Sequence, residues 1–263
     1  MSPTSTSTGV ALVTGAAQGI GKSIALRLAS DGFDVALNDI PSKKDELEAV
    51  MAEVLKTRHG IRASVVVGDV SSEESVSEMV QSVVAALGGL DVMVANAGIC
   101  KARASFLDVS AAEWDHTFSI NTRGTFLCYK YAAKQMISQG RGGRIIGACS
   151  GAGKQGYIAL PDYSSSKFAI RGLTQAVAQE LGKHGITVNA YAPGAVITPM
   201  TQQFPEMAGV PADDFFAAQA KMNATGVNVT PGDIASLVSF FASKESGFMT
   251  GQTLSADGGR YFD

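Results

Sequence analysis

The chain has 263 residues, of which 46% are hydrophobic and 17% charged, with 29 glycines and a formal net charge of −3. This composition is typical of one well-buried α/β domain and lacks the excess of basic residues expected of a nucleic-acid-binding protein. No run of about 18 apolar residues occurs, so we expect no transmembrane helix and no membrane partner. Three cysteines without CxxC spacing indicate reduced thiols in a cytoplasmic protein and predict no metal site.

Residues 1–9 are expected to form a flexible polar tail, and they do not resemble a signal peptide because no basic region precedes an apolar run. Residues 10–263 are predicted to form a single α/β domain. Apolar segments there alternate with segments of helical periodicity, which favours a doubly wound parallel sheet of about seven strands with helices on both faces. Ligands should bind at the carboxyl ends of its strands.

A glycine-rich turn follows the first predicted strand. Val10–Thr14 is an apolar strand, Gly15–Gly21 is the turn, and Lys22–Ser30 has helical periodicity. In this context glycines allow the backbone to approach a pyrophosphate, which then lies at the helix N-terminus. The turn therefore predicts a dinucleotide site, the alternative being a tight turn without a ligand.

The second predicted strand is formed by Asp34–Leu37, and Asn38-Asp39 ends it with an acidic residue. Asp39 stands about 20 positions after the glycine turn, where a carboxylate accepts hydrogen bonds from the adenosine ribose. It would also repel a 2′-phosphate, and neither Asn38 nor Ile40 beside it is basic. The sequence thus favours NAD(H) over NADP(H), unless Asp39 is a simple turn residue.

The next segments predict a helix and a third strand. The helix covers Lys43–Arg58 and is expected to be capped by Ser42, and the strand covers Ala63–Val67. Asp69 follows this strand. We expect it either to contact the adenine amine or to cap a helix that starts near Ser71.

The fourth predicted strand, Leu90–Ala95, precedes a turn of small residues that we expect to lie against the cofactor, Asn96–Gly98. A long helix is predicted over Ala111–Met136, with Asn121 among apolar neighbours. A mid-helix Asn is unfavourable by propensity. It either satisfies backbone groups at a kink or holds a water in a proton path.

The stretch from Ser150 to Lys167 is the strongest candidate for chemistry. Tyr163 and Lys167 are four residues apart and share one face of a predicted helix, and Ser150 ends the predicted strand Ile145–Cys149. A cationic Lys167 would lower the phenol pKa from about 10 and make Tyr163 a usable acid or base. The alternative is a surface Lys beside a half-buried Tyr.

The last third predicts a strand over Ile186–Tyr191, a helix over Pro231–Ala242 and a final strand over Thr250–Ala256. Between them, residues 197–229 are expected to form a mobile flap over a substrate pocket. The apolar side chains of this flap are Phe204, Met207, Phe215, Phe216 and Met222.

From Val10 to Gly259 the chain resembles the short-chain dehydrogenase/reductase family, whose members have a Rossmann fold. Thr14–Gly21 matches its TGxxxGIG pattern, Asn96–Gly98 its NAG turn, and Pro193-Gly194 with Thr198 its nicotinamide-side loop. The family's catalytic tetrad matches, in order and spacing, Asn121, Ser150, Tyr163 and Lys167.

This resemblance implies roles for individual residues. Tyr163 is expected to be the general acid/base, Ser150 to orient the substrate oxygen, and Asn121 to position a relay water. Lys167 is expected to hold the nicotinamide ribose and lower the Tyr163 pKa, while Val196 and Thr198 hold the carboxamide. The full set implied to bind NAD is Gly15, Gln18, Gly19, Ile20, Gly21, Asp39, Asp69, Val70, Asn96, Ala97, Gly98, Tyr163, Lys167, Pro193, Val196 and Thr198.

Within the family the chain looks most like diacetyl/acetoin reductases, also called 2,3-butanediol dehydrogenases. That group has Gln directly after the catalytic Ser and Asn midway to the Tyr, whereas this chain has Gly151 and Tyr157. Losing two amides favours a bulkier, more apolar alcohol, such as a terpenoid, contacted by Ser150, Gly151, Tyr157 and Tyr163.

Three alternatives stand beside an NAD(H)-dependent dehydrogenase of a bulky secondary alcohol. They are a diacetyl/acetoin reductase, an NADP(H)-dependent carbonyl or acyl-carrier ketoreductase, and a non-catalytic dinucleotide sensor. The resemblance also implies a homotetramer. Its helices Ala111–Met136 and Asp162–Leu181 would pair across a two-fold axis, and both are apolar over more than one face.

Overall fold

The computed structural model describes residues 7–262. Most of the expected flexible tail, residues 1–6, lies outside the described residues. Its last residues are already hydrogen-bonded to the domain, because the Thr8 amide donates to the Gly32 carbonyl at 2.8 Å and the Gly9 carbonyl accepts from the Asp34 amide at 2.9 Å.

One parallel sheet of seven strands forms the centre of the molecule, in the order β3-β2-β1-β4-β5-β6-β7. The chain builds outward from β1 to β3 and then returns to place β4 on the other side of β1, which confirms the predicted doubly wound sheet. The strands are β1 Val10–Thr14, β2 Asp34–Asp39, β3 Ala63–Val67, β4 Val92–Ala95, β5 Gly143–Ala148, β6 Ile186–Pro193 and β7 Thr253–Ala256.

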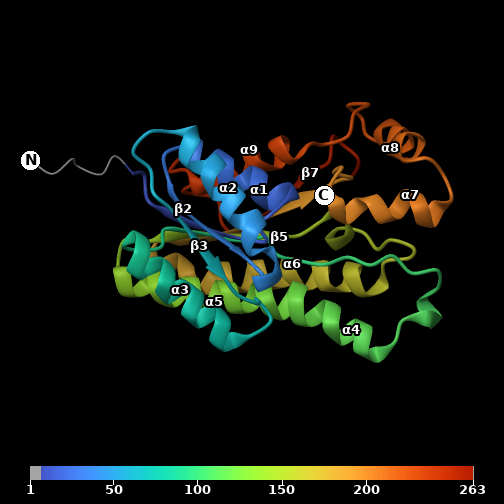
Figure 1. Cartoon of the computed structure of the whole chain (residues 1–263). Helices are drawn as coiled ribbons and strands as arrows, with labels where there is room; N and C mark the ends of the chain where they lie inside the picture. Colours follow the sequence, from blue (N-terminus) through green and yellow to red (C-terminus); the bar gives the residue numbers. More distant parts are fainter. Residues whose placement is uncertain (1–6, 263) are drawn as a thin grey trace, which may run out of the picture.

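Helices cover both faces of this sheet (Figure 1). One face carries α1 Gly19–Ser30, α2 Lys44–Thr57 and α9 Pro231–Ala242, and the other carries α3 Glu73–Leu87, α5 Gly124–Gln139 and α6 Pro161–Leu181. The helix α4 Ala111–Phe118 leads into α5, while α7 Gln203–Ala208 and α8 Ala212–Lys221 lie at one end of the molecule.

Alternate residues of each strand supply the two cores. On β1, Ala11 and Val13 pack with α1, α2 and α9, whereas Leu12 packs with α3 and α5. Successive side chains of a strand point to opposite faces, so a sheet covered on both sides needs continuous apolar strands. This requirement explains why the strands could be recognised as unbroken apolar runs.

Two local features differ from the sequence-based prediction. Ser42 does not cap the second helix, because Pro41–Lys43 form a 3₁₀ turn that leads directly into α2. The predicted long helix is interrupted at Ser119–Arg123 by a π-helical turn that contains Asn121. Such wide turns are often found at functional sites.

None of the helices within residues 7–262 is long and apolar enough to cross a membrane. All three cysteines are free. Among the same described residues, no group of three or more His, Cys, Asp or Glu side chains has the geometry of a metal site.

Candidate active site

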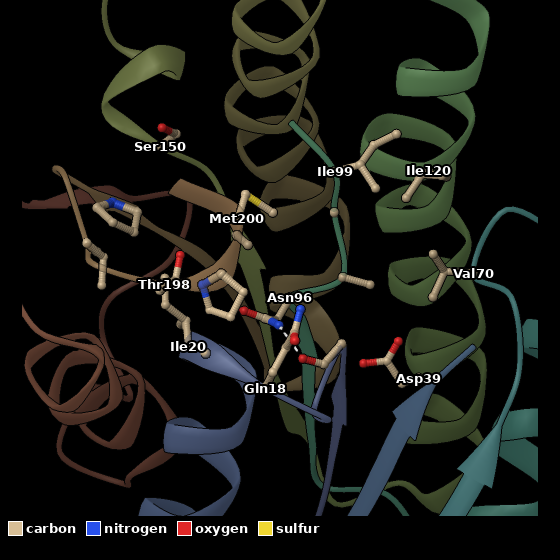
Figure 2. Close-up of a pocket in the computed structure, with 18 of the residues that line it drawn as sticks. Gln18, Ile20, Asp39, Val70, Asn96, Ile99, Ile120, Ser150, Thr198 and Met200 are labelled. Carbon is tan, nitrogen blue, oxygen red and sulfur yellow. Dashed lines mark hydrogen bonds between the residues drawn. The ribbon is translucent and has the colours of Figure 1, made fainter. Parts of the chain in front are cut away.

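A cleft of about 560 Å³ opens at the carboxyl ends of β1, β2, β4, β5 and β6. Figure 2 shows Asp39 at one end and Ser150 at the other, with Gln18 and Asn96 between them. All residues predicted to bind the cofactor line this cleft except Gly21, which lies just behind the glycine turn. The site thus lies where the strand order reverses, the position at which doubly wound sheets bind ligands.

The glycine turn has the backbone geometry that its sequence predicts. Gly15 and Gly19 have φ angles of +65° and +56°, which glycine adopts without strain. A Cβ atom at Gly21 would overlap the Gly15 carbonyl oxygen. The turn therefore stays narrow, and the start of α1 reaches the floor of the cleft.

The N-terminus of α1 is suited to an anion. Gln18 is its N-cap residue but makes no side-chain capping hydrogen bond, and the first turn holds no acidic residue. The backbone amides of the first turn of α1 and the positive end of the helix dipole favour a pyrophosphate. Together with the glycine geometry, this arrangement fits a dinucleotide.

Asp39 lies at the end of β2, at the expected ribose end of the cleft. Its carboxylate oxygens accept from the Ala17 amide at 3.2 Å and the Ile40 amide at 2.9 Å. Lys43 lines the same end of the cleft and forms an ion pair with Glu46 at 2.8 Å. The sequence did not indicate Lys43, because the 3₁₀ turn Pro41–Lys43 is what brings it to the cleft.

Asp69 also lines the cleft, but it does not cap α3, because its carboxylate bonds only within the turn before the helix. Its carboxylate accepts from both the amide and the hydroxyl of Ser71 at 2.8 Å, while Ser72 caps α3. Val70 lies beside Asp69 in the cleft wall and packs closely against Gly124. A contact of Asp69 with adenine stays a prediction.

The Asn96 side chain joins the turns after β1 and β4. Its amide nitrogen donates to the Thr14 carbonyl at 2.8 Å, and its oxygen accepts from the Tyr191 hydroxyl at 2.8 Å. The Thr14 hydroxyl in turn accepts from the Asn96 and Ala97 amides, each at 3.0 Å. These bonds fix the floor of the cleft, a role that the sequence did not reveal for Tyr191.

Asn121 is fully buried in the π-helical turn. Its side-chain oxygen accepts from the Ile99 amide at 2.8 Å, and its nitrogen donates to the Ile99 carbonyl at 2.9 Å and to Ser166 Oγ at 3.0 Å. The side chain thus satisfies a neighbouring backbone segment, one of the two interpretations offered above. The segment it holds follows Asn96–Gly98 at the cleft wall.

Ser150, Tyr163 and Lys167 meet at the far end of the cleft. The Ser150 hydroxyl, just after β5, lies near the Tyr163 phenol and accepts from the Ala152 amide at 3.1 Å. Lys167 Nζ donates to the Ala148 carbonyl at 2.8 Å and lies 5.4 Å from the centre of the Tyr163 ring. A strand end and one helix face therefore bring these three groups together.

Burial shifts the pKa values of Tyr163 and Lys167. It raises the pKa of the Tyr163 phenol well above its ordinary value, and the nearby Ser150 hydroxyl opposes only part of this rise. Burial also lowers the pKa of Lys167 to about 8. The predicted lowering of the Tyr163 pKa by Lys167 is wrong for this structure, because loss of hydration disfavours the charged form of each group.

A second cavity of about 300 Å³ adjoins the cleft and shares Ser150 and Tyr163 with it. Gly151 and Tyr157 line one wall, and their contact with a substrate stays a prediction. The flap segment is folded into α7 and α8, whose apolar side chains line the opposite wall: Phe204, Met207, Phe215 and Phe216. Met222 does not line the cavity and is 58% exposed.

A buried ion pair supports the N-terminus of α6. Arg103 and Asp162 are 7% and 0% exposed, with 3.5 Å between Arg103 Nη2 and Asp162 Oδ2. The same carboxylate oxygen accepts from the Thr117 hydroxyl at 2.7 Å. Asp162 directly precedes Tyr163, so this pair fixes the start of the helix that carries the phenol. No sequence motif indicated it.

Comparison with known proteins supports the resemblance. The family model for short chain dehydrogenase matches residues 9–209. A short-chain dehydrogenase/reductase of Armillaria gallica is 53% identical over 264 residues, covering 100% of both chains. The L-2,3-butanediol dehydrogenase of Corynebacterium glutamicum is 40% identical over 260 residues, covering 97% of this chain and 99% of the relative.

Comparison with solved structures agrees with the sequence comparison. The crystal structure of carveol dehydrogenase from Mycobacterium avium in complex with NAD has a TM-score of 0.90 and 32% sequence identity, with 97% of this chain and 98% of that chain covered. Sequence, fold and the arrangement of the cleft lead to one conclusion. The chain belongs to the short-chain dehydrogenase/reductase family of oxidoreductases.

Proposed function

We propose that the protein is an NAD(H)-dependent dehydrogenase that interconverts a bulky apolar secondary alcohol and its ketone. The observation that carries this proposal is the position of Ser150 and Tyr163, which line both the dinucleotide cleft and the apolar cavity. A substrate carbon in the cavity would therefore face the nicotinamide end of the cleft. The nicotinamide, when bound, supplies the site with a hydride acceptor or donor.

The chain's own residues handle the substrate oxygen and its proton. In reduction the protonated Tyr163 phenol gives its proton to the carbonyl oxygen, and in oxidation its deprotonated form takes the hydroxyl proton, while the nearby Ser150 hydroxyl orients the substrate oxygen. Lys167 holds the cofactor ribose beside this pair. Asn121 fixes the Ile99 backbone, and the family resemblance implies that it also positions a water that relays the proton to solvent.

Cofactor choice is proposed to depend on Asp39. Its carboxylate at the ribose end would accept hydrogen bonds from the ribose hydroxyls and repel a 2′-phosphate. The carveol dehydrogenase with the same fold was crystallised with NAD, which supports this assignment. Lys43 at the same end is the feature that favours NADP(H) instead.

We expect Asp39→Ala to lower kcat/KM with NAD and raise it with NADP, because ribose hydrogen bonds and phosphate repulsion are lost together. Each lost charge-assisted hydrogen bond is worth about 1.5–3 kcal/mol, or roughly 10-fold or more. Lys43→Ala is the matched variant, and it should weaken only the use of NADP. A parent enzyme that already prefers NADPH would contradict the role given to Asp39.

The apolar cavity supports a substrate larger and less polar than acetoin. Gly151 and Tyr157 offer no amide to a second substrate oxygen, and four Phe and Met side chains line the opposite wall. Each Å² of apolar surface buried there contributes about 25 cal/mol to binding. The 2,3-butanediol dehydrogenase relative keeps the diacetyl/acetoin alternative open.

The test compares kcat/KM for acetoin, a medium-chain secondary alcohol and monocyclic and bicyclic terpene alcohols, with NAD. We expect the larger alcohols to have lower KM values, and a Gly151→Gln/Tyr157→Asn double variant to shift preference toward acetoin. If acetoin or diacetyl is the best substrate of the parent, the pocket argument fails. No turnover with any alcohol, despite cofactor binding, would favour the dinucleotide sensor.

We also propose a homotetramer located in the cytoplasm. Phe126 on α5 and Phe168 on α6 are 44% and 43% exposed, as expected if these helices pair with a second copy. Sedimentation at micromolar protein concentration should therefore give a species close to four times 27.2 kDa. A monomer would contradict the assembly and leave the proposed reaction untouched.

A further inference from the structure

We propose that the C-terminal segment Asp257–Tyr261 completes the substrate cavity, with Tyr261 and Arg260 as residues that position its walls and set its specificity. This inference rests on the proposed function, which assigns the cavity to the substrate. The segment lies beyond residues 9–209, the part of the chain that matches the family model.

Tyr261 supports the cavity wall from behind. The Tyr157 hydroxyl donates to the Tyr261 hydroxyl at 2.7 Å, and the two rings meet edge to face with their centroids 6.1 Å apart. Tyr157 lines the cavity, whereas Tyr261 does not. Because the bond holds the far end of the Tyr157 ring, Tyr261 decides how far this ring extends into the cavity.

The same pair explains the glycine at position 151. A Cβ atom there would lie 3.2 Å from the Tyr157 hydroxyl and 3.6 Å from Tyr261 Cε2. Any side chain there, Gln included, therefore requires the Tyr157 hydroxyl to shift slightly. Gly151, Tyr157 and Tyr261 are therefore packed together. Replacing Gly151 alone should displace the side chains of Tyr157 and Tyr261.

Arg260 connects the segment to the opposite wall. Its guanidinium donates to Gln219 Oε1 at 2.8 Å and to Met222 Sδ at 3.3 Å, at the C-terminal end of α8, and its Nε donates to the Tyr261 hydroxyl at 3.2 Å. Arg260 is the only charged side chain among the described residues that line the cavity. One side chain thus links the α8 wall to the tyrosine wall.

Asp257 fixes the backbone of the segment. One carboxylate oxygen accepts from the Gly259 amide at 2.9 Å and the Arg260 amide at 3.2 Å, and the other accepts from the Tyr261 amide at 3.1 Å. The Thr225 amide, just after α8, donates to the Gly258 carbonyl at 3.0 Å. These hydrogen bonds hold the segment Asp257–Tyr261 in place between the α8 wall and the Tyr157 wall of the cavity.

The test measures steady-state kinetics of Tyr261→Phe, Tyr157→Phe and the double variant with a bulky alcohol and with acetoin. Each single variant should raise KM for the bulky alcohol roughly fivefold, the value of one hydrogen bond, and leave KM for NAD unchanged. The double variant should be no worse than either single one, because both remove the same bond. KM for acetoin should hardly change.

A second measurement does not depend on turnover. Cys100 lines the cavity, whereas Cys128 and Cys149 are buried. Arg260→Met should separate the walls and increase the rate at which iodoacetamide labels Cys100, measured by mass spectrometry. Tyr131→Phe and Arg141→Met are matched controls, since both lose contacts far from the cavity, to Glu73 and Asp91.

Unchanged KM values in both tyrosine variants, or an unchanged Cys100 labelling rate in Arg260→Met, would overturn the inference. Failure of the proposed function has a different signature, namely a parent enzyme that turns over no alcohol or a Tyr163→Phe variant that remains active. In that case the rate of Cys100 labelling in Arg260→Met still decides whether the C-terminal segment holds the two cavity walls together.

Discussion

Replacing Tyr163 with Phe is expected to lower kcat by about 10²-fold or more, the range for loss of a general acid or base. The substitution removes only the hydroxyl that exchanges a proton with the substrate and leaves the ring that packs beside Lys167. NADH should still bind, because the glycine turn and Asp39 are unaffected. Stopped-flow or steady-state absorbance of NADH gives kcat, and its fluorescence gives binding.

Tyr131→Phe is the control for this experiment, since its hydroxyl contacts only Glu73 at 3.1 Å on the outer surface. It should keep the activity of the parent. A Tyr163→Phe variant with comparable activity would disprove the acid/base assignment, and with it the proposed mechanism.

Replacing Arg103 with Met should destabilise the protein by about 3–5 kcal/mol, the range for removing one partner of a buried ion pair. The Asp162 carboxylate would stay fully buried with only the Thr117 hydroxyl as a hydrogen-bond partner. Urea unfolding at one fixed protein concentration measures the change in the free energy of unfolding.

Arg141→Met is the matched control, because the Arg141 side chain is 50% exposed in its ion pair with Asp91. An exposed pair contributes about 1 kcal/mol or less. Adding Asp162→Asn to Arg103→Met should restore part of the lost stability by removing the buried charge. Equal effects of the two arginine substitutions would show that burial of the Arg103–Asp162 pair is unimportant.

The glycine turn and the Tyr163–Lys167 pair were predictable because local sequence dictates them, whereas Asn121 was joined to this pair by the family resemblance. Gly15 and Gly19 have φ angles that favour glycine, and Gly21 has no space for a side chain. Tyr163 and Lys167 share a helix face through their spacing alone. Each of these features depends on neighbours within one turn or one strand, which periodicity and composition reveal.

The pKa values of Tyr163 and Lys167 could not be predicted from local sequence in the same way. The spacing of Tyr163 and Lys167 indicated that the charge on the lysine would lower the phenol pKa. The fold buries Lys167 and half-buries Tyr163 at the cleft, and the loss of hydration raises the pKa of Tyr163 and lowers that of Lys167 to about 8. Burial depends on the packing of the whole chain around the cleft, so no local pattern encodes it.

The sequence by itself determined the doubly wound sheet and the glycine turn, because these follow from strand periodicity and short spacings, and its resemblance to the short-chain dehydrogenase/reductase family implied the other residues that line the cofactor cleft. Only the tertiary structure placed Lys43 beside Asp39, Arg103 against Asp162 and Tyr261 against Tyr157. The last two pairs join residues 59 and 104 positions apart. Such contacts are made by the packing of distant segments, which leaves no repeating pattern in the sequence.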